Sequence, residues 1–167
     1  MQSNRALVVI DMQNAVTPLY QAESVLALIN QRIAAYRENN QPVVFVQHEE
    51  AGMAYQSEGW QLVSGLDVLP SDFYVRKTYP DAFLKTNLAA LLDQLGVTEL
   101  EICGAEIPFC VDTTIRVAFH EGYALFVTRG AVSMTPMGKI AVPDLINHYQ
   151  TVWDGRFVTF LAAKSTE

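Results

Sequence analysis

Short, mainly apolar runs alternate with helical patterns along most of this chain. Apolar residues recur at helical spacing between the runs, as Val25, Ile29 and Ile33 show. The runs themselves resemble strands buried on both faces, and they occur at residues 6–10, 43–46, 73–76, 100–103, 124–127 and 157–161. Strands joined by helices form parallel sheets through right-handed crossovers. We therefore predict an α/β protein with a three-layer, Rossmann-like fold, whose mainly parallel sheet has about six strands and carries helices on both faces.

Composition narrows the class of protein. Half of the residues are hydrophobic and 17% are charged, which is typical of a globular chain, and we expect residues 1–167 to form a single domain. The net charge is -7 and no Lys/Arg cluster occurs, so we expect no nucleic-acid partner. No run approaches membrane-spanning length, and we expect no membrane partner. Two cysteines that make no disulfide framework, and a polar start without a signal peptide, predict a cytoplasmic protein.

Three residues with chemical potential follow predicted strands. Asp11 follows the first strand, Lys77 follows the third, and Cys110 falls in the first turn of the helix that leaves the fourth. The carboxyl ends of parallel strands meet at one edge of a sheet, where ligands of such sheets bind, so the three side chains can converge. Taken singly, Asp11 could be a turn acid, Lys77 a solvated charge and Cys110 a buried apolar group.

The environment expected for Cys110 favours its thiolate form. The first turn of a helix presents unpaired amides and the positive end of the dipole, and both lower the pKa of a thiol. A nearby Lys77 ammonium would act in the same direction. We therefore expect the pKa of Cys110 to lie below its ordinary value.

Three motifs carry a resemblance to a known family. VVIDMQN at residues 8–14, RKTYPDAF at 76–83 and CGAEIPFCVDTTIRVAFHEGY at 103–123 stand in the order and spacing of the isochorismatase-like cysteine hydrolases. That superfamily includes nicotinamidases and carbamoylsarcosine amidohydrolases. The resemblance extends from about residue 6 to residue 130.

The resemblance implies a site and a reaction. Asp11 would be the catalytic acid–base, Lys77 its cationic partner and Cys110 the nucleophile. A non-proline cis peptide between Ala105 and Glu106 would turn backbone N–H groups toward the oxygen of the substrate. The implied reaction is hydrolysis of an amide-like C–N bond in a small molecule through an acyl-thioester. The resemblance also implies a homo-oligomer, a dimer or higher.

The loop before Cys110 departs from the family pattern. Glu106 stands where a neutral residue is common, Ile107 replaces a hydroxyl residue, and Pro108 removes an amide. These departures motivate an alternative from another class, a non-catalytic or regulatory protein that senses a ligand or redox state on the same scaffold. A dinucleotide-binding oxidoreductase is disfavoured, because no G-x-G-x-x-G follows the first strand.

Several further residues are candidates to line a substrate pocket, although packing without substrate contact explains each of them equally well. They are Gln13, Tyr20, His48, Trp60, Phe83 and Phe109, together with Glu106. His48 is the one histidine in the segment that directly follows the second strand, whereas the nicotinamidase branch has an Asp-x-His and a further His there. We therefore expect no metal ion and no other cofactor.

Overall fold

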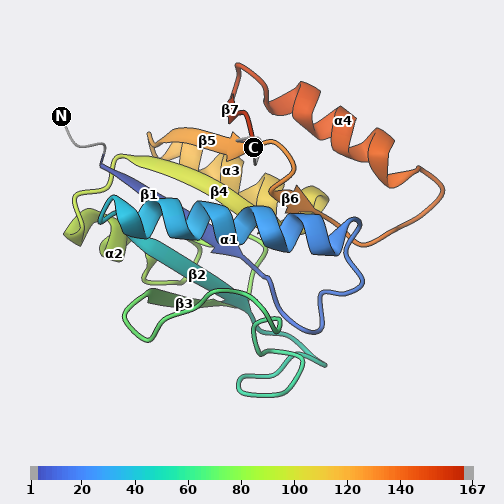
Figure 1. Ribbon diagram of the computed structural model, residues 1–167, viewed down its shortest axis with the longest axis horizontal. Coiled ribbons are helices and arrows are strands. Elements are labelled where there is room, and N and C mark those ends of the chain that lie inside the picture. Colours follow the sequence, from blue (N-terminus) through green and yellow to red (C-terminus); the bar gives the residue numbers. More distant parts are fainter. Residues whose placement is uncertain (1–3, 164–167) are drawn as a thin grey trace.

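Seven strands form one sheet in the structure, a computed structural model that describes residues 4–163 (Figure 1). The spatial order is β3-β2-β1-β4-β5-β7, β6 pairs with β4, and every pairing is parallel. The strands are β1 (Arg5–Ile10), β2 (Val43–His48), β3 (Phe73–Lys77), β4 (Glu99–Ala105), β5 (Ala124–Thr128), β6 (Val132–Ser133) and β7 (Thr159–Leu161). The predicted α/β class is confirmed. The additional strand, β6, has only two residues, too few for a sequence pattern to indicate.

Helices cover both faces of this sheet (Figure 1). They are α1 (Ala22–Glu38), α2 (Leu88–Gln94), α3 (Asp112–His120) and α4 (Val142–Trp153). α1 lies on one face, α2 and α3 lie on the other, and α4 lies beside β5 and β7. None of the helices between residues 4 and 163 is both long and apolar enough to cross a lipid bilayer.

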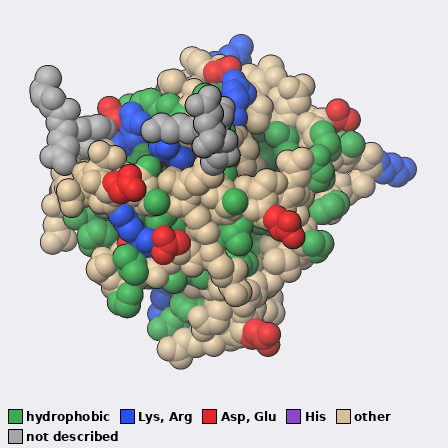
Figure 2. Space-filling view, in the orientation of Figure 1, with side chains coloured by type: hydrophobic (Ala, Val, Ile, Leu, Met, Phe, Trp, Pro, Cys, Tyr) green, Lys and Arg blue, Asp and Glu red, His purple; other side chains and the backbone are tan. Residues whose placement is uncertain are grey.

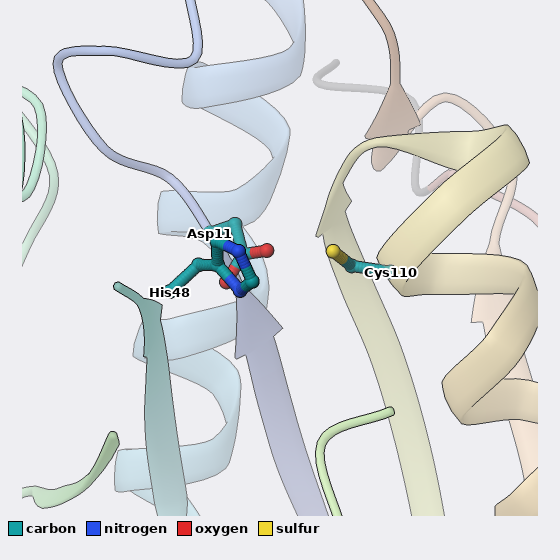
Figure 3. Close-up of side chains that lie close together, drawn as sticks. All are labelled: Asp11, His48 and Cys110. Atoms are coloured by element: carbon teal, nitrogen blue, oxygen red, sulfur yellow. The ribbon is translucent and has the colours of Figure 1, made fainter. Parts of the chain in front are cut away.

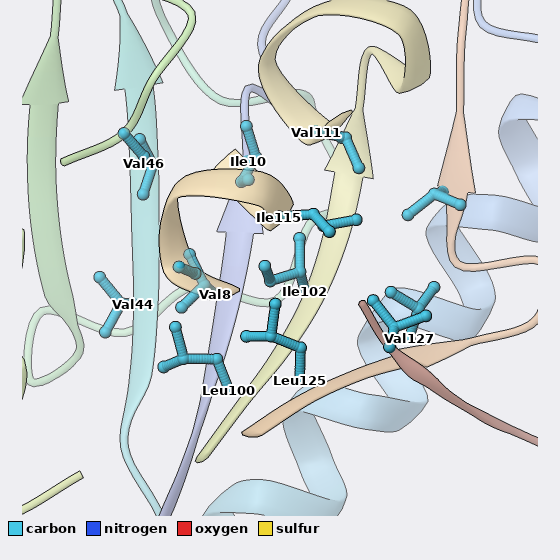
Figure 4. Close-up of a cluster of buried hydrophobic side chains, with 14 of the residues drawn as sticks. Val8, Ile10, Val44, Val46, Leu100, Ile102, Val111, Ile115, Leu125 and Val127 are labelled. Atoms are coloured by element: carbon cyan, nitrogen blue, oxygen red, sulfur yellow. The ribbon is translucent and has the colours of Figure 1, made fainter. Parts of the chain in front are cut away.

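The alternating side chains of β1 supply both halves of the core. Val8 and Ile10 point to the α3 side, where they pack in a cluster with Ile102 and Ile115 (Figure 4). Leu7, Val9 and their neighbours point to the α1 side and pack in a second cluster. Burial on both faces explains why the strand reads as a continuous apolar run and not as an alternating one.

A buried carboxylate fixes α1 against the centre of the sheet. Glu101 on β4 is fully buried and receives hydrogen bonds from the Arg32 guanidinium at 2.7 and 2.8 Å. The Tyr36 hydroxyl donates to it at 2.9 Å and the Thr128 hydroxyl at 2.6 Å. A buried charge is stable only with such partners, so this network determines how α1 lies on the sheet.

The order of the strands reverses between β1 and β4, which lie side by side. The register pairs Ile10, the last residue of β1, with Gly104, the last but one of β4, so the two strands end at nearly the same level of the sheet. Chain segments leave these two strands toward opposite faces, and the space between them is where ligands of open α/β sheets bind. Asp11 follows directly on one side of this point and Ala105 on the other.

Close approach of the two backbones makes Gly104 the critical position at this edge. Its φ is +108°, and a Cβ there would lie 2.1 Å from the carbonyl oxygen of Ile10. We predict that Gly104→Ala lowers the free energy of unfolding by at least about 3 kcal/mol, because backbone would have to move. Urea unfolding measures this loss.

Gly122→Ala is the matched control, since Gly122 has a φ of +92° and nothing lies within 4 Å of the position that the added methyl group would take. Its expected loss is about 1 kcal/mol, from the backbone conformation alone. Equal losses for the two variants would contradict the close-approach explanation.

Candidate active site

Asp11, Lys77 and Cys110 meet at the carboxyl edge of the sheet. Lys77 is the last residue of β3 and is 1% exposed, and Asp11 follows β1 and is 3% exposed. Cys110 is half-buried in a π-helical turn, Ile107–Val111, that leads from β4 into α3. The Lys77 ammonium donates to Oδ2 of Asp11 at 2.9 Å and to Sγ of Cys110 at 3.1 Å.

His48 is the third partner of the same ammonium. Nδ1 of this residue, the last in β2, lies 2.9 Å from Nζ of Lys77. An ammonium only donates, so the imidazole accepts through Nδ1 and carries its hydrogen on Nε2. Nε2 faces the Glu50 carboxylate at 3.6 Å. Figure 3 shows the Cys110 sulfur pointing toward Asp11 and His48 across the ends of the strands.

The backbone fixes these side chains in place. Asp11 has a φ of 49°, a left-handed conformation that is uncommon outside glycine, and its N–H donates to the carbonyl of Val46 on β2. The N–H of Glu49 donates to the carbonyl of Lys77 on β3. The ends of β1, β2 and β3 are therefore connected beyond the last regular strand pairs.

Burial and charge set the protonation of the Asp11–Cys110 pair. Burial raises the pKa of the Cys110 thiol to about 12, the Asp11 charge adds to this rise, and Lys77 offsets it only in part. Burial also raises the pKa of Asp11, against the effect of Lys77. One ammonium cannot support two anions in this space, and the carboxyl is the stronger acid. The resting pair is therefore a carboxylate and a thiol, and the expected lowering of the Cys110 pKa was wrong.

Three side chains of types that bind metal ions lie close together here, although we expected no metal site. One potential ligand atom each from Asp11, His48 and Cys110 lie within 4.8 Å of one another (Figure 3). The Lys77 ammonium, however, donates to all three residues. A metal ion bound by this set would have to displace a cation that the protein itself supplies. The absence of a bound metal stays a prediction.

A cavity of about 400 Å³ opens beside the Cys110 sulfur. Its polar lining consists of Asp11, His48, Glu50, Thr78, Glu106 and Cys110. Its apolar lining consists of Val16, Met53, Pro80 and Phe109. The sequence analysis did not predict Glu50 as a lining residue, although the acidic pair Glu49-Glu50 directly after β2 could have suggested it.

Three of the seven predicted pocket residues line this cavity, and four lie elsewhere. His48, Glu106 and Phe109 line it. Tyr20 lines a different hollow beside α4. The Phe83 ring packs against Tyr123 at 5.9 Å, and the Trp60 ring contacts Tyr55 at 4.9 Å.

Gln13 has a structural position instead of a lining one. Its side chain is fully buried, and its amide donates to the carbonyls of His48 and Trp60 at 3.0 and 2.9 Å. Its amide oxygen accepts the N–H of His48 at 2.8 Å. All of these contacts are with backbone groups, so Gln13 fastens the ends of β1 and β2 to the long loop that follows β2.

The loop before Cys110 has the geometry that the resemblance implied. The peptide between Ala105 and Glu106 is cis. The Glu106 carboxylate accepts a hydrogen bond from the N–H of Thr135 at 2.7 Å and another from its hydroxyl. Glu106 therefore joins this loop to the segment that follows β6.

Comparison with known proteins supports the family resemblance that the sequence motifs indicated. The family model of the isochorismatase domain matches residues 5–138. The chain belongs to the isochorismatase family. This isochorismatase-family hydrolase is 44% identical in sequence to an isochorismatase family protein of known crystal structure. The structural match has a TM-score of 0.94 and covers 96% of this chain and 99% of that one.

Two curated relatives have named activities. Streptothricin hydrolase from Streptomyces noursei is 34% identical over 134 residues, which are 76% of this chain. The match spans only about half of that relative, 49% of its length. Nicotinamidase 3 from Arabidopsis thaliana is 30% identical over 146 residues, which cover 77% of this chain and 72% of the relative.

The raised pKa of Cys110 predicts the pH dependence of its alkylation. A thiol with a pKa of about 12 is almost fully protonated at neutral pH, so we expect the rate with iodoacetamide to keep rising up to about pH 10 without a plateau. Cys103 is fully buried, and Cys110→Ala measures any reaction there. A plateau with a midpoint below about pH 8.5 would contradict the protonated resting thiol.

Proposed function

We propose that this protein is a cysteine amidohydrolase that cleaves the C–N bond of a small amide through an acyl-thioester on Cys110. The observation that carries the proposal is the contact of one buried ammonium, on Lys77, with both a carboxylate and a thiol at the wall of a cavity. A nucleophile beside a base that a third group orients is the general arrangement of covalent catalysis. The family, and relatives named as a nicotinamidase and a streptothricin hydrolase, support the same reaction class.

In the first half of the reaction, Asp11 takes the proton of Cys110 as the sulfur attacks the carbonyl carbon. Oδ2 of Asp11 holds the ammonium, while Oδ1 has no hydrogen-bond partner among the residues described and is available for this proton. Lys77 stays protonated and stabilises the charge that develops on sulfur. The N–H groups of Glu106 and Cys110 stabilise the carbonyl oxyanion, and one such donor contributes about 2.7–4 kcal/mol in comparable sites.

The first half ends when the C–N bond of the tetrahedral intermediate breaks: Asp11 gives its proton to the leaving nitrogen, the amine departs, and the acyl-thioester remains on Cys110. In the second half, Asp11, again a carboxylate, takes a proton from water as the water oxygen attacks the thioester carbonyl. The carboxylic acid leaves, and the proton on Asp11 passes back to sulfur. The raised pKa of Asp11 suits a group that gains and loses one proton in each half-reaction.

The alternative of a redox-sensing protein has less support. A sensor thiol is normally acidic and paired with a resolving cysteine. Burial raises the pKa of Cys110, and Cys103 lies in the core on the α1 side of the sheet, whereas Cys110 packs against the core on the other side. A disulfide between them would have to cross the sheet.

The other expectations stay proposals. A homo-oligomer and a cytoplasmic location follow from the resemblance and the composition. On the face shown in Figure 2, acidic and basic side chains are interspersed among hydrophobic and other groups. This mixed surface is compatible with a small-molecule substrate and no nucleic-acid partner.

A screen of small primary amides and ureido compounds for released ammonia tests the proposed reaction. We predict that Cys110→Ala abolishes release, and that Asp11→Asn lowers it by at least about 10³-fold, because the nucleophile and the base respectively are lost. Circular dichroism and thermal unfolding check that both variants fold. Full activity in folded Cys110→Ala protein would refute the role of the sulfur.

Lys77→Met tests the charge that the ammonium supplies. Without it, the pKa of Asp11 rises further and the sulfur anion loses its counter-charge, so we expect kcat to fall by at least about 100-fold. Arg76→Met is the matched control, because Arg76 is the preceding cation on β3 and pairs with Glu49 outside the cavity lining. Similar losses in both variants would argue for a general effect of charge on β3.

A further inference from the structure

Two hollows meet beside the active site, and a pair of carboxylates stands where they join. The cavity at Cys110 and an outer groove of about 710 Å³ share four lining residues: Val16, Glu50, Met53 and Glu106. A substrate whose carbonyl reaches the sulfur can therefore extend its remote end past Glu50 and Glu106 into the groove. Neither residue belongs to the proton-transfer group formed by Asp11, Lys77 and Cys110.

The charge at this junction is unbalanced. Asp11, Glu50 and Glu106 line the cavity, and the Lys77 ammonium is paired with Asp11. No lysine or arginine of the described chain lines either hollow. The two glutamates thus present negative charge to the bound molecule without a lysine or arginine among the described lining residues, and Glu50 lies 3.6 Å from Nε2 of His48.

The contacts of Glu106 keep its carboxylate oriented toward this space. Thr135 donates both its N–H and its hydroxyl to one oxygen, Oε1. Within residues 4–163, no hydrogen bond or ion pair is made by the other oxygen, Oε2. Thr135 therefore fixes the orientation of the Glu106 carboxylate through one oxygen and leaves the other oxygen for a ligand.

We propose that this site selects substrates that carry a positive charge, an ammonium or guanidinium group, on the end remote from the scissile carbonyl. Glu106 and Glu50 receive that cation at the junction of the cavity and the groove. Val16, Met53 and Phe109 provide the apolar walls for the chain that connects the charge to the carbonyl. That the bound molecule is an amide substrate rests on the proposed function. The preference for a positive charge rests on the cavity lining and holds for any reaction at Cys110.

A purely structural role for Glu106 is the competing explanation, and Glu106→Gln separates the two. The amide oxygen of glutamine can still accept both hydrogen bonds from Thr135, while the negative charge is lost. Glu50→Gln removes the second charge. Glu58→Gln is the matched control, because Glu58 is an exposed acid of the same loop as Glu50 and lines neither hollow.

Thiosulfonates of different charge measure the preference without any turnover. Each reagent forms a mixed disulfide with Cys110, and its sulfinate leaves. We compare the rate of 2-(trimethylammonium)ethyl methanethiosulfonate with that of the 2-sulfonatoethyl reagent, and divide by the same ratio for 2-mercaptoethanol. The ionisation of the thiol cancels in this ratio. Cys110→Ala corrects for any reaction elsewhere.

We expect the normalised ratio to favour the cation by about tenfold or more at low salt and to fall as salt is added. Glu106→Gln and Glu50→Gln should each lower it severalfold, and Glu58→Gln should leave it unchanged. A ratio near one, or a ratio that neither cavity variant lowers, would overturn the proposal.

Three amides of equal length then separate charge selection from the reaction: 5-aminopentanamide, hexanamide and adipic acid monoamide. The proposal predicts the highest kcat/KM for the cationic amide and the lowest for the anionic one, with the order flattened in Glu106→Gln. Equal values would refute charge selection and leave the reaction standing. If none of the three amides is hydrolysed, that result counts against amide hydrolysis as the reaction. The thiosulfonate ratio would still decide the charge preference.

Discussion

The buried ammonium of Lys77 is the interaction on which the rest of the site depends. An ammonium taken out of water is stable only where acceptors surround it. Here the three acceptors are Asp11, which follows β1, His48, which ends β2, and Cys110, which lies in the turn after β4. A single charge therefore connects four segments that lie far apart in the sequence. If these segments did not meet at one edge of the sheet, the charge would have no place in the interior.

The same charge limits what its partners can do. One ammonium stabilises one anion well, so the carboxylate of Asp11 and a thiolate at Cys110 compete for it. The resting state keeps the proton on sulfur, and in the proposed reaction that proton moves only when the substrate is bound. Such a site is unreactive toward water and stray electrophiles at rest, because the thiolate, not the thiol, is the nucleophile.

Much of this arrangement could be predicted from the sequence, because topology determines it. Buried strands joined by helices imply a parallel sheet, and a parallel sheet brings Asp11, Lys77 and the segment with Cys110 to one edge. What could not be predicted depends on the reach of single side chains. Neither the position of the His48 ring beside Lys77 nor the fully engaged amide of Gln13 has a signal in spacing or periodicity.

Electrostatic balance was the other part that sequence patterns could not supply. The expected low pKa of Cys110 rested on a helix start and a neighbouring lysine, both of which are present. The extent of burial and the charge of Asp11 outweigh them, and both depend on packing in three dimensions. Glu101 in the centre of β4 is a second example. A charged residue within an apolar strand does not indicate which arginine, tyrosine and threonine will donate hydrogen bonds to it.

Mass spectrometry of the enzyme quenched with acid during turnover of an amide tests the central claim most directly. The account predicts a mass increase equal to the acyl part of the amide, located by peptide mapping on Cys110. Adding hydroxylamine should release it, as expected for a thioester. Sustained ammonia release from an enzyme whose Cys110 never carries the acyl group, even at the shortest quench times, would contradict covalent catalysis by this sulfur.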